Sequence, residues 1–227
     1  MFWTWSHGCF GPDPIIMFSF DILDLGLVDY SEALAIQNRL VCEVSSGVKI
    51  STLILCEHNP VITLGRQANE KNILKPQDAL MKMGISTYNV HRGGDVTMHI
   101  PGQLVVYPIF SLRQWKRDLH KFLRAMEEAI LLLLRGYHIK GIRKENNTGV
   151  WVGDKKIASI GISVSRWVTS HGLSLNVGGN LDLFSLIRPC GQDIMMTSMT
   201  EILGPNNVNI EKVKGVLIHK FREVFKA

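Results

Sequence analysis

The residue that most suggests chemistry is Cys190, which lies between Pro189 and Gly191 in the stretch SLIRPCGQD. Proline fixes its own backbone and has no amide proton, whereas glycine lets the chain turn sharply. A core cysteine normally lies inside an apolar run, as Cys56 does in TLILCEH. The flanking residues therefore predict that Cys190 is presented on a turn rather than packed, a setting in which a thiol can act as a nucleophile.

Lys156 is the second candidate, because it begins the apolar run KIASIGI. Strand alternation predicts that Lys156, Ala158 and Ile160 share one face, and a lysine on an inward face costs free energy unless it has a partner. The opposite assignment fits the pattern equally well: Lys155 points inward and Lys156 extends its amine to solvent.

Two glycine-containing loops could bind a ligand. In HRGGDVTMHIPGQL, Arg92 supplies a cation, and Gly93 and Gly94 let the backbone approach a ligand closely. The Lys-Ser/Thr pair of a phosphate loop is missing, so a structural turn is the competing interpretation. In TSHGLSLNV, His171 and Gly172 at a strand start could turn backbone amides toward a developing oxyanion, although most His-Gly pairs are simple turns.

Helices and strands must position these residues. Helical periodicity predicts one helix after Asp29, with Glu32 completing a capping interaction, a second from Asp118 to Gly136, and a third over residues 210–224. Strand-like runs lie between them: STLILCEH, VITLG, QLVVYPIFSL, TGVWV, KIASIGISV and LSLNV.

The stretch GVWV-GD-KKIA predicts a hairpin with a two-residue turn, in which Val152 faces Lys155 and Trp151 faces Lys156. Strands and helices alternate without a regular rhythm. The predicted class is therefore α+β, with a mixed β-sheet packed with helices.

Composition narrows the functional classes. The chain has 227 residues, 46% hydrophobic and 20% charged, which suits one large domain. Its net charge of +5 is spread along the chain, which argues against nucleic-acid binding but suits acidic partners. The spacing of the four cysteines and eight histidines predicts no disulfide and no metal site, and favours a reducing, cytoplasmic location. Residues 1–17 make a poor signal peptide, and we expect no membrane span.

Four segments, in order, resemble the lipoyl(octanoyl) transferase family: EHNPVITLGR, RGGDVTMHIPGQLVVYP, TGVWVGDKKIASIGISVSRWVTSHGLSLNV and IRPCG. The resemblance covers roughly residues 18–200 and implies a fold like that of the biotin and lipoate protein ligases. It implies a single catalytic domain over residues 18–227, with residues 1–17 as an extension of unknown role.

The resemblance also implies an activity: transfer of an octanoyl group from octanoyl-acyl carrier protein, through a cysteine acyl-thioester, to a lysine of a lipoyl domain in lipoate biosynthesis. The implied acceptors are the lipoyl domains of 2-oxoacid dehydrogenases and the glycine cleavage H protein. No cofactor, nucleic acid or membrane is implied.

By the same resemblance, the thioester cysteine is Cys190 and its partner lysine is Lys156. We expect Lys156 to act mainly as a proton carrier, and backbone amides near Gly172 and Leu173 to hold the oxyanion. The implied substrate-binding residues are Arg92, Gly93, Gly94, Asp95, Val96, Thr97, Met98, His99, Ser159, Ile160, Gly161, Gly172, Leu173 and Ser174.

Two residues depart from the family pattern, since Met98 replaces an aromatic residue and Ile100 replaces a glycine. We interpret this pair as a compensated repacking of the wall of an acyl tunnel.

Three alternatives compete with this reading. An ATP-dependent lipoate or biotin ligase would need no nucleophilic cysteine. A non-catalytic module would only bind lipoyl domains and would need neither Lys156 nor Cys190. A cysteine thioesterase would use water as the acceptor.

Overall fold

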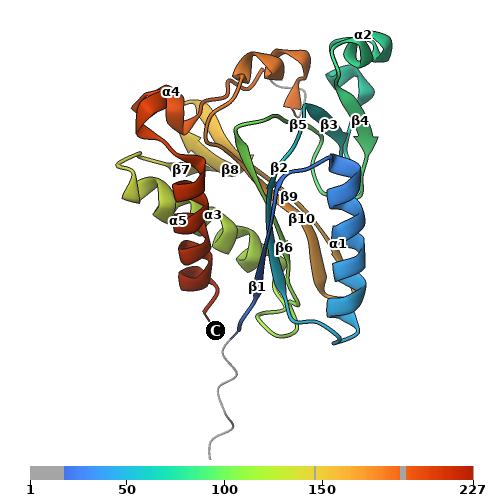
Figure 1. Cartoon of the computed structure of the whole chain (residues 1–227), viewed down its shortest axis with the longest axis vertical. Coiled ribbons are helices and arrows are strands. Elements are labelled where there is room, and N and C mark those ends of the chain that lie inside the picture. The colour runs from blue at the N-terminus through green and yellow to red at the C-terminus, as the bar shows by residue number, and fades with distance from the viewer. Residues whose placement is uncertain (1–17, 146, 190–192, 227) are drawn as a thin grey trace, which may run out of the picture.

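The structure is a computed structural model that describes residues 18–145, 147–189 and 193–226. Cys190 and the N-terminal residues 1–17 therefore lie outside the described residues. A large sheet runs through the middle of the molecule with helices on both faces, and a small sheet lies across one end (Figure 1).

The large sheet has seven strands and is mixed. The edge strand β1 pairs in parallel with β2, and every other pairing in this sheet is antiparallel. The strands in spatial order are β1 (Asp21–Leu27), β2 (Thr52–Glu57), β6 (Gln103–Ile109), β10 (Val168–Asn176), β9 (Lys155–Ser165), β8 (Asn147–Val152) and β7 (Ile142–Lys144). The predicted α+β class with a mixed sheet is confirmed.

Helices cover both faces of this sheet, which explains the continuous apolar runs of its central strands. Helices α3 (Leu119–Gly136) and α5 (Ile210–Val224) pack on one face, and α1 (Tyr30–Ser45) packs on the other (Figure 1). In β6, Val106 faces the α3–α5 core while Val105 and Tyr107 face α1. The three predicted helices are confirmed.

The predicted helix starts are confirmed only in part. The Asp118 carboxylate accepts a hydrogen bond from the Lys121 amide at 3.0 Å, as an N-cap residue does. Asp29 also occupies an N-cap position, but its side chain makes no capping bond. Its carboxylate instead accepts from the Asn59 side-chain amide at 3.0 Å, so the predicted capping interaction with Glu32 is wrong.

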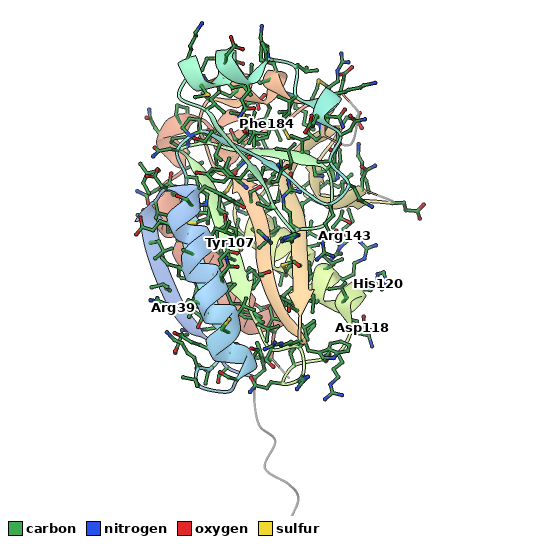
Figure 2. The ribbon with its side chains drawn as sticks, turned by 90° about the vertical axis from the view of Figure 1, so that its right-hand side faces the viewer. Arg39, Tyr107, Asp118, His120, Arg143 and Phe184 are labelled. Atoms are coloured by element: carbon green, nitrogen blue, oxygen red, sulfur yellow. The ribbon has the colours of Figure 1, made fainter. Side chains whose placement is uncertain are left out.

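The small sheet has the order β4 (Ser86–Asn89), β3 (Val61–Leu64), β5 (Val96–His99). Its core lies against α2 (Gln77–Lys82) and the 3₁₀ segment η2 (Leu181–Leu186), and Figure 2 labels Phe184 in this region. The remaining short elements are η1 (Glu70–Asn72), α4 (Met199–Leu203) and η4 (Pro205–Asn207).

The β8–β9 hairpin has the predicted register at its turn, since Val152 pairs with Lys155 and Trp151 with Lys156. Beyond these pairs Val150 pairs with Ala158, so Ile157 is an extra residue on β9 and forms a β-bulge. The bulge places both Ile157 and Ala158 in the buried core. The predicted face shared by Lys156, Ala158 and Ile160 is therefore wrong, because the bulge shifts the alternation of the strand.

Candidate active site

A cavity of about 370 Å³ brings together residues from the two sheets and from α3. The predicted site residues that line it are Arg92, Gly93, Gly94, Asp95, Val96, Thr97, Lys156, Ser159, Ile160 and Gly161. Much of the remaining wall of this cavity comes from two residues of α3, Leu119 and Leu123, and two of β8, Asn147 and Thr148. Pro189, which precedes Cys190 in the sequence, also lines this outer cavity.

A smaller cavity of about 50 Å³ shares walls with the outer one, through Arg92, Thr97, Ser159, Ile160 and Gly161. The predicted residues His99, Gly172, Leu173 and Ser174 line only this inner cavity. The inner cavity is also lined by Tyr30, Val105, Tyr107 and His171. The shared lining residues show that the two cavities adjoin, so residues from both predicted loops meet in one site.

Arg92 holds the RGGD loop in place as well as lining both cavities. Its guanidinium donates to the Thr63 carbonyl at 2.7 Å, to the Thr63 hydroxyl at 2.9 and 3.1 Å, and to the Gly93 carbonyl at 3.0 Å. The Gly93 amide in turn donates to the Ile162 carbonyl at 2.8 Å, which fixes the loop against β9. Arg92 therefore uses much of its hydrogen-bonding capacity to hold the loop in place.

Asp95 connects the same loop to the chain that leads to Cys190. Its carboxylate accepts from the Asn69 amide at 3.0 Å and from the side-chain amide of Asn72. The Asn72 carbonyl accepts from the Arg188 amide at 2.8 Å. Both oxygens of the Asp95 carboxylate thus have protein partners, which favours a structural role over direct contact with a substrate.

Lys156 faces the outer cavity, and Lys155 faces away from it. The Lys155 amine forms an ion pair with Glu201 at 2.7 Å on the far side of the strand. The Lys156 amine lies 5.3 Å from the ring centre of Trp151. The Lys156 backbone is held on its outer side, because its amide donates to Met195 at 2.8 Å and its carbonyl accepts from Thr197 at 3.0 Å. The sequence left open which of the two lysines points inward, and the structure shows that it is Lys156.

A chain of hydrogen bonds determines which nitrogen of His99 carries the proton. The Asn176 amide group donates to the Thr197 carbonyl at 3.0 Å, so the Asn176 side-chain oxygen accepts from the Gln103 amide group at 2.8 Å. The Gln103 oxygen must then accept from His99 Nδ1 at 2.7 Å. Burial lowers the pKa of His99 to about 3, so the ring is neutral near pH 7 and Nε2 carries a lone pair.

His58 and Tyr107 form a second buried pair beside the inner cavity. His58 Nδ1 donates to the Val28 carbonyl at 2.8 Å, so Nε2 accepts from the Tyr107 hydroxyl at 2.8 Å. Burial lowers the pKa of His58 and raises that of Tyr107, and both groups are therefore neutral. Tyr107 lies in the middle of the molecule in Figure 2, and the Tyr30 ring packs on His58 with 5.4 Å between ring centres.

Sequence reasoning missed Tyr30, His58 and Tyr107 as site residues. His58 and Tyr107 fall inside quoted motifs, EHNPVITLGR and QLVVYP, but nothing in their spacing indicates that the two rings meet. Only the pairing of β2 with β6 brings them together.

The predicted oxyanion hole near Gly172 and Leu173 is wrong. β10 is a central strand, and Leu173 pairs with Val106 on one side and with Ile160 on the other, so the ladders use the backbone amides there. The His171 amide donates to the Gln37 side chain at 2.9 Å. Gly172 has a packing role, because a Cβ there would lie 1.9 Å from the Val106 carbonyl oxygen.

Met98 and Ile100 lie away from both cavities. Each is fully buried in the core of the small sheet with Ile62 and Phe184, whereas Thr97 and His99 of the same segment face the cavities. The predicted repacking of a tunnel wall by Met98 and Ile100 is therefore wrong. Alternation along β5 turns Met98 away from the cavities, and Ile100, just after β5, packs in the same core as Met98.

No group of three or more histidine, cysteine, aspartate or glutamate side chains within residues 18–145, 147–189 and 193–226 could hold a metal ion. Within the same described ranges, no helix is long and apolar enough to cross a membrane.

Comparison with known proteins assigns the family. Residues 29–222 match the family described as the lipoyl protein ligase A/B catalytic domain, and the chain belongs to this family. An octanoyltransferase of Solibacter usitatus is 49% identical over 178 residues, which cover 78% of this chain and 81% of that protein. An octanoyltransferase of a Thermoanaerobacter species is 46% identical over 207 residues and covers 90% of each chain.

The fold agrees with this assignment. A crystal structure of lipoate-protein ligase A bound with ATP superposes with a TM-score of 0.76 at 20% identity, over 90% of this chain and 84% of that one. A biotin protein ligase of Aquifex aeolicus gives a TM-score of 0.53 at 14% identity, over 92% of this chain and 70% of that one. The expected biotin and lipoate protein ligase fold is confirmed.

Proposed function

We propose that this chain is an acyltransferase that moves an octanoyl group from octanoyl-acyl carrier protein to a lysine of a lipoyl domain, through a thioester on Cys190. One observation carries the proposal: Lys156 and Pro189, the residue before Cys190, line the same cavity as the RGGD loop. The octanoyltransferase names of relatives at 46–49% identity support the acyl group.

The first half of the reaction loads the enzyme. Neutral Lys156 takes the proton of the Cys190 thiol, and the thiolate attacks the carbonyl carbon of the octanoyl thioester. The carbon–sulfur bond to the carrier breaks, and the departing thiolate takes the proton from Lys156. The products are an octanoyl-Cys190 thioester, a free carrier thiol and a neutral Lys156.

The second half of the reaction transfers the octanoyl group from Cys190 to the acceptor lysine. The acceptor lysine has an ordinary pKa near 10.4 and must lose a proton before it attacks. Neutral Lys156 accepts that proton, and the amine attacks the Cys190 thioester. The carbon–sulfur bond breaks, the sulfur takes the remaining proton from the attacking nitrogen, and an amide is left on the lipoyl domain. Lys156 then releases its proton to solvent.

The two cavities suit an acyl chain between these steps. Ile160 contributes to both cavities, and Val105 and Leu173 give the inner one apolar walls. The ring of Tyr30 and the neutral ring of His99 stack nearly parallel there, with 6.2 Å between ring centres. We infer that the octanoyl chain runs from Lys156 toward these rings, where burial of its methylenes favours binding.

The acceptors we propose are the lipoyl domains of 2-oxoacid dehydrogenases and the glycine cleavage H protein, and the cysteine usage favours a cytoplasmic location. The fold is shared with ATP-dependent ligases, but such an enzyme activates its acid as an adenylate and needs no cysteine. The role given to Cys190 therefore separates the two activities.

Intact-mass spectrometry tests the proposal. Incubation with octanoyl-acyl carrier protein should add one octanoyl group without ATP, and hydroxylamine should remove it, because it cleaves thioesters. Cys190→Ala should form no adduct, while Cys42→Ala, at an exposed cysteine on α1, should form it normally. An adduct that persists in Cys190→Ala, or that requires ATP, would contradict the assignment.

A further inference from the structure

Cationic side chains gather where the loop before α3 meets the turn between β9 and β10. The two segments are joined, since the Leu112 amide donates to the Trp167 carbonyl at 2.8 Å and Ser111 forms a bridge with Val168. The Arg117 guanidinium lies 6.0 Å from the ring centre of Trp167. We call the exposed cations of these segments the basic surface: Arg113, Lys116, Arg117, Lys121 and Arg166.

The positive charge of the basic surface is largely uncompensated. Asp118 is the sole acidic residue in residues 111–121 and 165–168, and its carboxylate lies 3.5 Å from the Lys121 amine. Within the described part of the chain, the other four cations of the basic surface form no ion pair. One turn further along α3, by contrast, Arg124 pairs with Glu127 at 2.8 Å. The excess charge is therefore local, and a local excess attracts an acidic partner.

The backbone of the β9–β10 turn is strained in a way that presents two large side chains. Ser165 pairs with Val168, so Arg166 and Trp167 form a two-residue turn, and their φ angles are 52° and 67°. Turns with both φ angles positive normally contain Asn-Gly, because a Cβ is disfavoured there. The turn nevertheless leaves Trp167 40% exposed. Such strain is typical of functional positions.

The basic surface adjoins the outer cavity. Leu119, which is 41% exposed, lines that cavity together with Leu123, and it stands two residues after Arg117. Figure 2 shows the neighbouring residues Asp118 and His120 at the beginning of α3, on the outside of the molecule. A protein docked on the basic surface would therefore stand at the rim of the cavity.

We propose that the basic surface and Trp167 dock the acyl donor, an acidic protein that carries its acyl group as a thioester on a long, phosphate-bearing arm. This inference rests on the proposed function and locates its donor. None of the basic surface lines the cavity beside Lys156 and Pro189. A long arm can span the distance from the basic surface to this cavity. The acceptor presents only a single lysine side chain and must therefore dock closer to the reacting atoms.

Charge reversal tests the docking. The variant Arg113→Glu/Lys116→Glu/Arg117→Glu is compared with Lys82→Glu/Lys140→Glu/Lys212→Glu, which makes the same change in net charge at exposed lysines elsewhere. Each variant is assayed with octanoyl-acyl carrier protein and with octanoyl-pantetheine, which has no protein part. We expect the first variant to raise the KM for the carrier protein about tenfold or more, and the control variant to change it little. The KM for octanoyl-pantetheine should stay the same in both.

A second variant tests the turn and is expected to fold well. Arg166→Asn/Trp167→Gly installs the unstrained turn sequence, so it should raise Tm by a few degrees while it weakens binding of the carrier protein. A side chain with a purely structural role would not give this opposite pair of effects. Binding is measured by fluorescence anisotropy of labelled carrier protein, which requires no turnover.

Three results would overturn the docking proposal: an unchanged carrier affinity in both variants, an equal loss in the lysine control, or a raised KM for the lipoyl domain in place of the carrier. A wild-type protein that binds the carrier through the basic surface but forms no octanoyl adduct would instead refute the proposed function.

Discussion

Gly149 and Lys156 are so close that a Cβ on Gly149 would lie 2.7 Å from Cε of Lys156 and 2.4 Å from the Ala158 carbonyl oxygen. Gly149 also has a φ of 129°, a conformation that other residues rarely adopt. Because Gly149 pairs with Ser159, its missing side chain would stand on the face of the sheet that carries Ser159. The position of the Lys156 amine therefore depends on a glycine on the neighbouring strand.

Gly149→Ala is expected to displace Lys156 and to reduce octanoyl transfer about a hundredfold, since small misplacements of a reacting group have effects of that size. Gly153→Ala is the matched control, because Gly153 also has a positive φ, of 57°, but no atom within 4 Å of a built Cβ. It should lose about 1 kcal/mol of stability and keep its activity. Transfer rates and urea unfolding separate the two effects. Equal activity in both variants would show that Gly149 does not position the lysine.

Lys156→Arg should be nearly as inactive as Lys156→Ala in transfer to a lipoyl domain. Arginine keeps the positive charge, but it does not release its proton in a protein and so cannot carry one between sulfur and nitrogen. Lys155→Arg is the control, because its amine pairs with Glu201 away from the cavity. Single-turnover rates measure each half of the reaction. High activity in Lys156→Arg would mean that the charge alone supports catalysis.

The sequence predicts local features of this fold more reliably than long-range ones. The β8–β9 hairpin follows from the Gly-Asp turn, and the start of α3 follows from Asp118, because each depends on a few adjacent residues. The bulge at Ile157 leaves no comparable signal, since it depends on how β9 matches its partner strand. Asp29 likewise has the composition of a cap, yet its carboxylate binds Asn59, thirty residues away.

The same distinction holds for the site. The RGGD loop and the β9 segment are recognised from motifs, and both line the outer cavity. The orientation of Met98 and Ile100 depends on which face of β5 meets the core, and β5 lies outside the strand-like runs of the sequence. The proton position on His99 follows from Gln103 and Asn176, which meet only through the pairing of β10 with β6.

Acyl-chain selection should respond to Thr97 and not to Ile100. Thr97 lines both cavities, so Thr97→Leu adds volume to the proposed acyl path and should favour donors shorter than octanoyl. Thr97→Val, which has the same branched shape, should leave the profile unchanged. Ile100→Gly should lower the free energy of unfolding by about 3–5 kcal/mol, because it removes a fully buried side chain, without altering the profile. The measurement is the rate of adduct formation across a series of donor chain lengths. A profile extended by Ile100→Gly would place Ile100 in the acyl path after all.

Stability should fall as the pH is lowered from 7 to 5, because the fold keeps buried histidines neutral. Burial lowers the pKa of His99 to about 3, and burial, with nearby Arg92, lowers that of His171 to about 4. The unfolded chain takes up a proton at each of these residues near pH 6.5, and the folded protein does not. The unfolded state therefore binds more protons in this interval, and each such histidine contributes a loss of about 1.4 kcal/mol per pH unit below pH 6.5.

His171→Gln should make this slope shallower by about that amount between pH 6 and pH 5, since glutamine does not titrate. His120→Gln is the control for the substitution itself, because it replaces an exposed histidine on α3 by the same residue. Urea unfolding at a series of pH values gives the free energies directly. If His171→Gln and His120→Gln had the same slope as the wild type, the His171 ring would already be protonated or exposed in the folded protein.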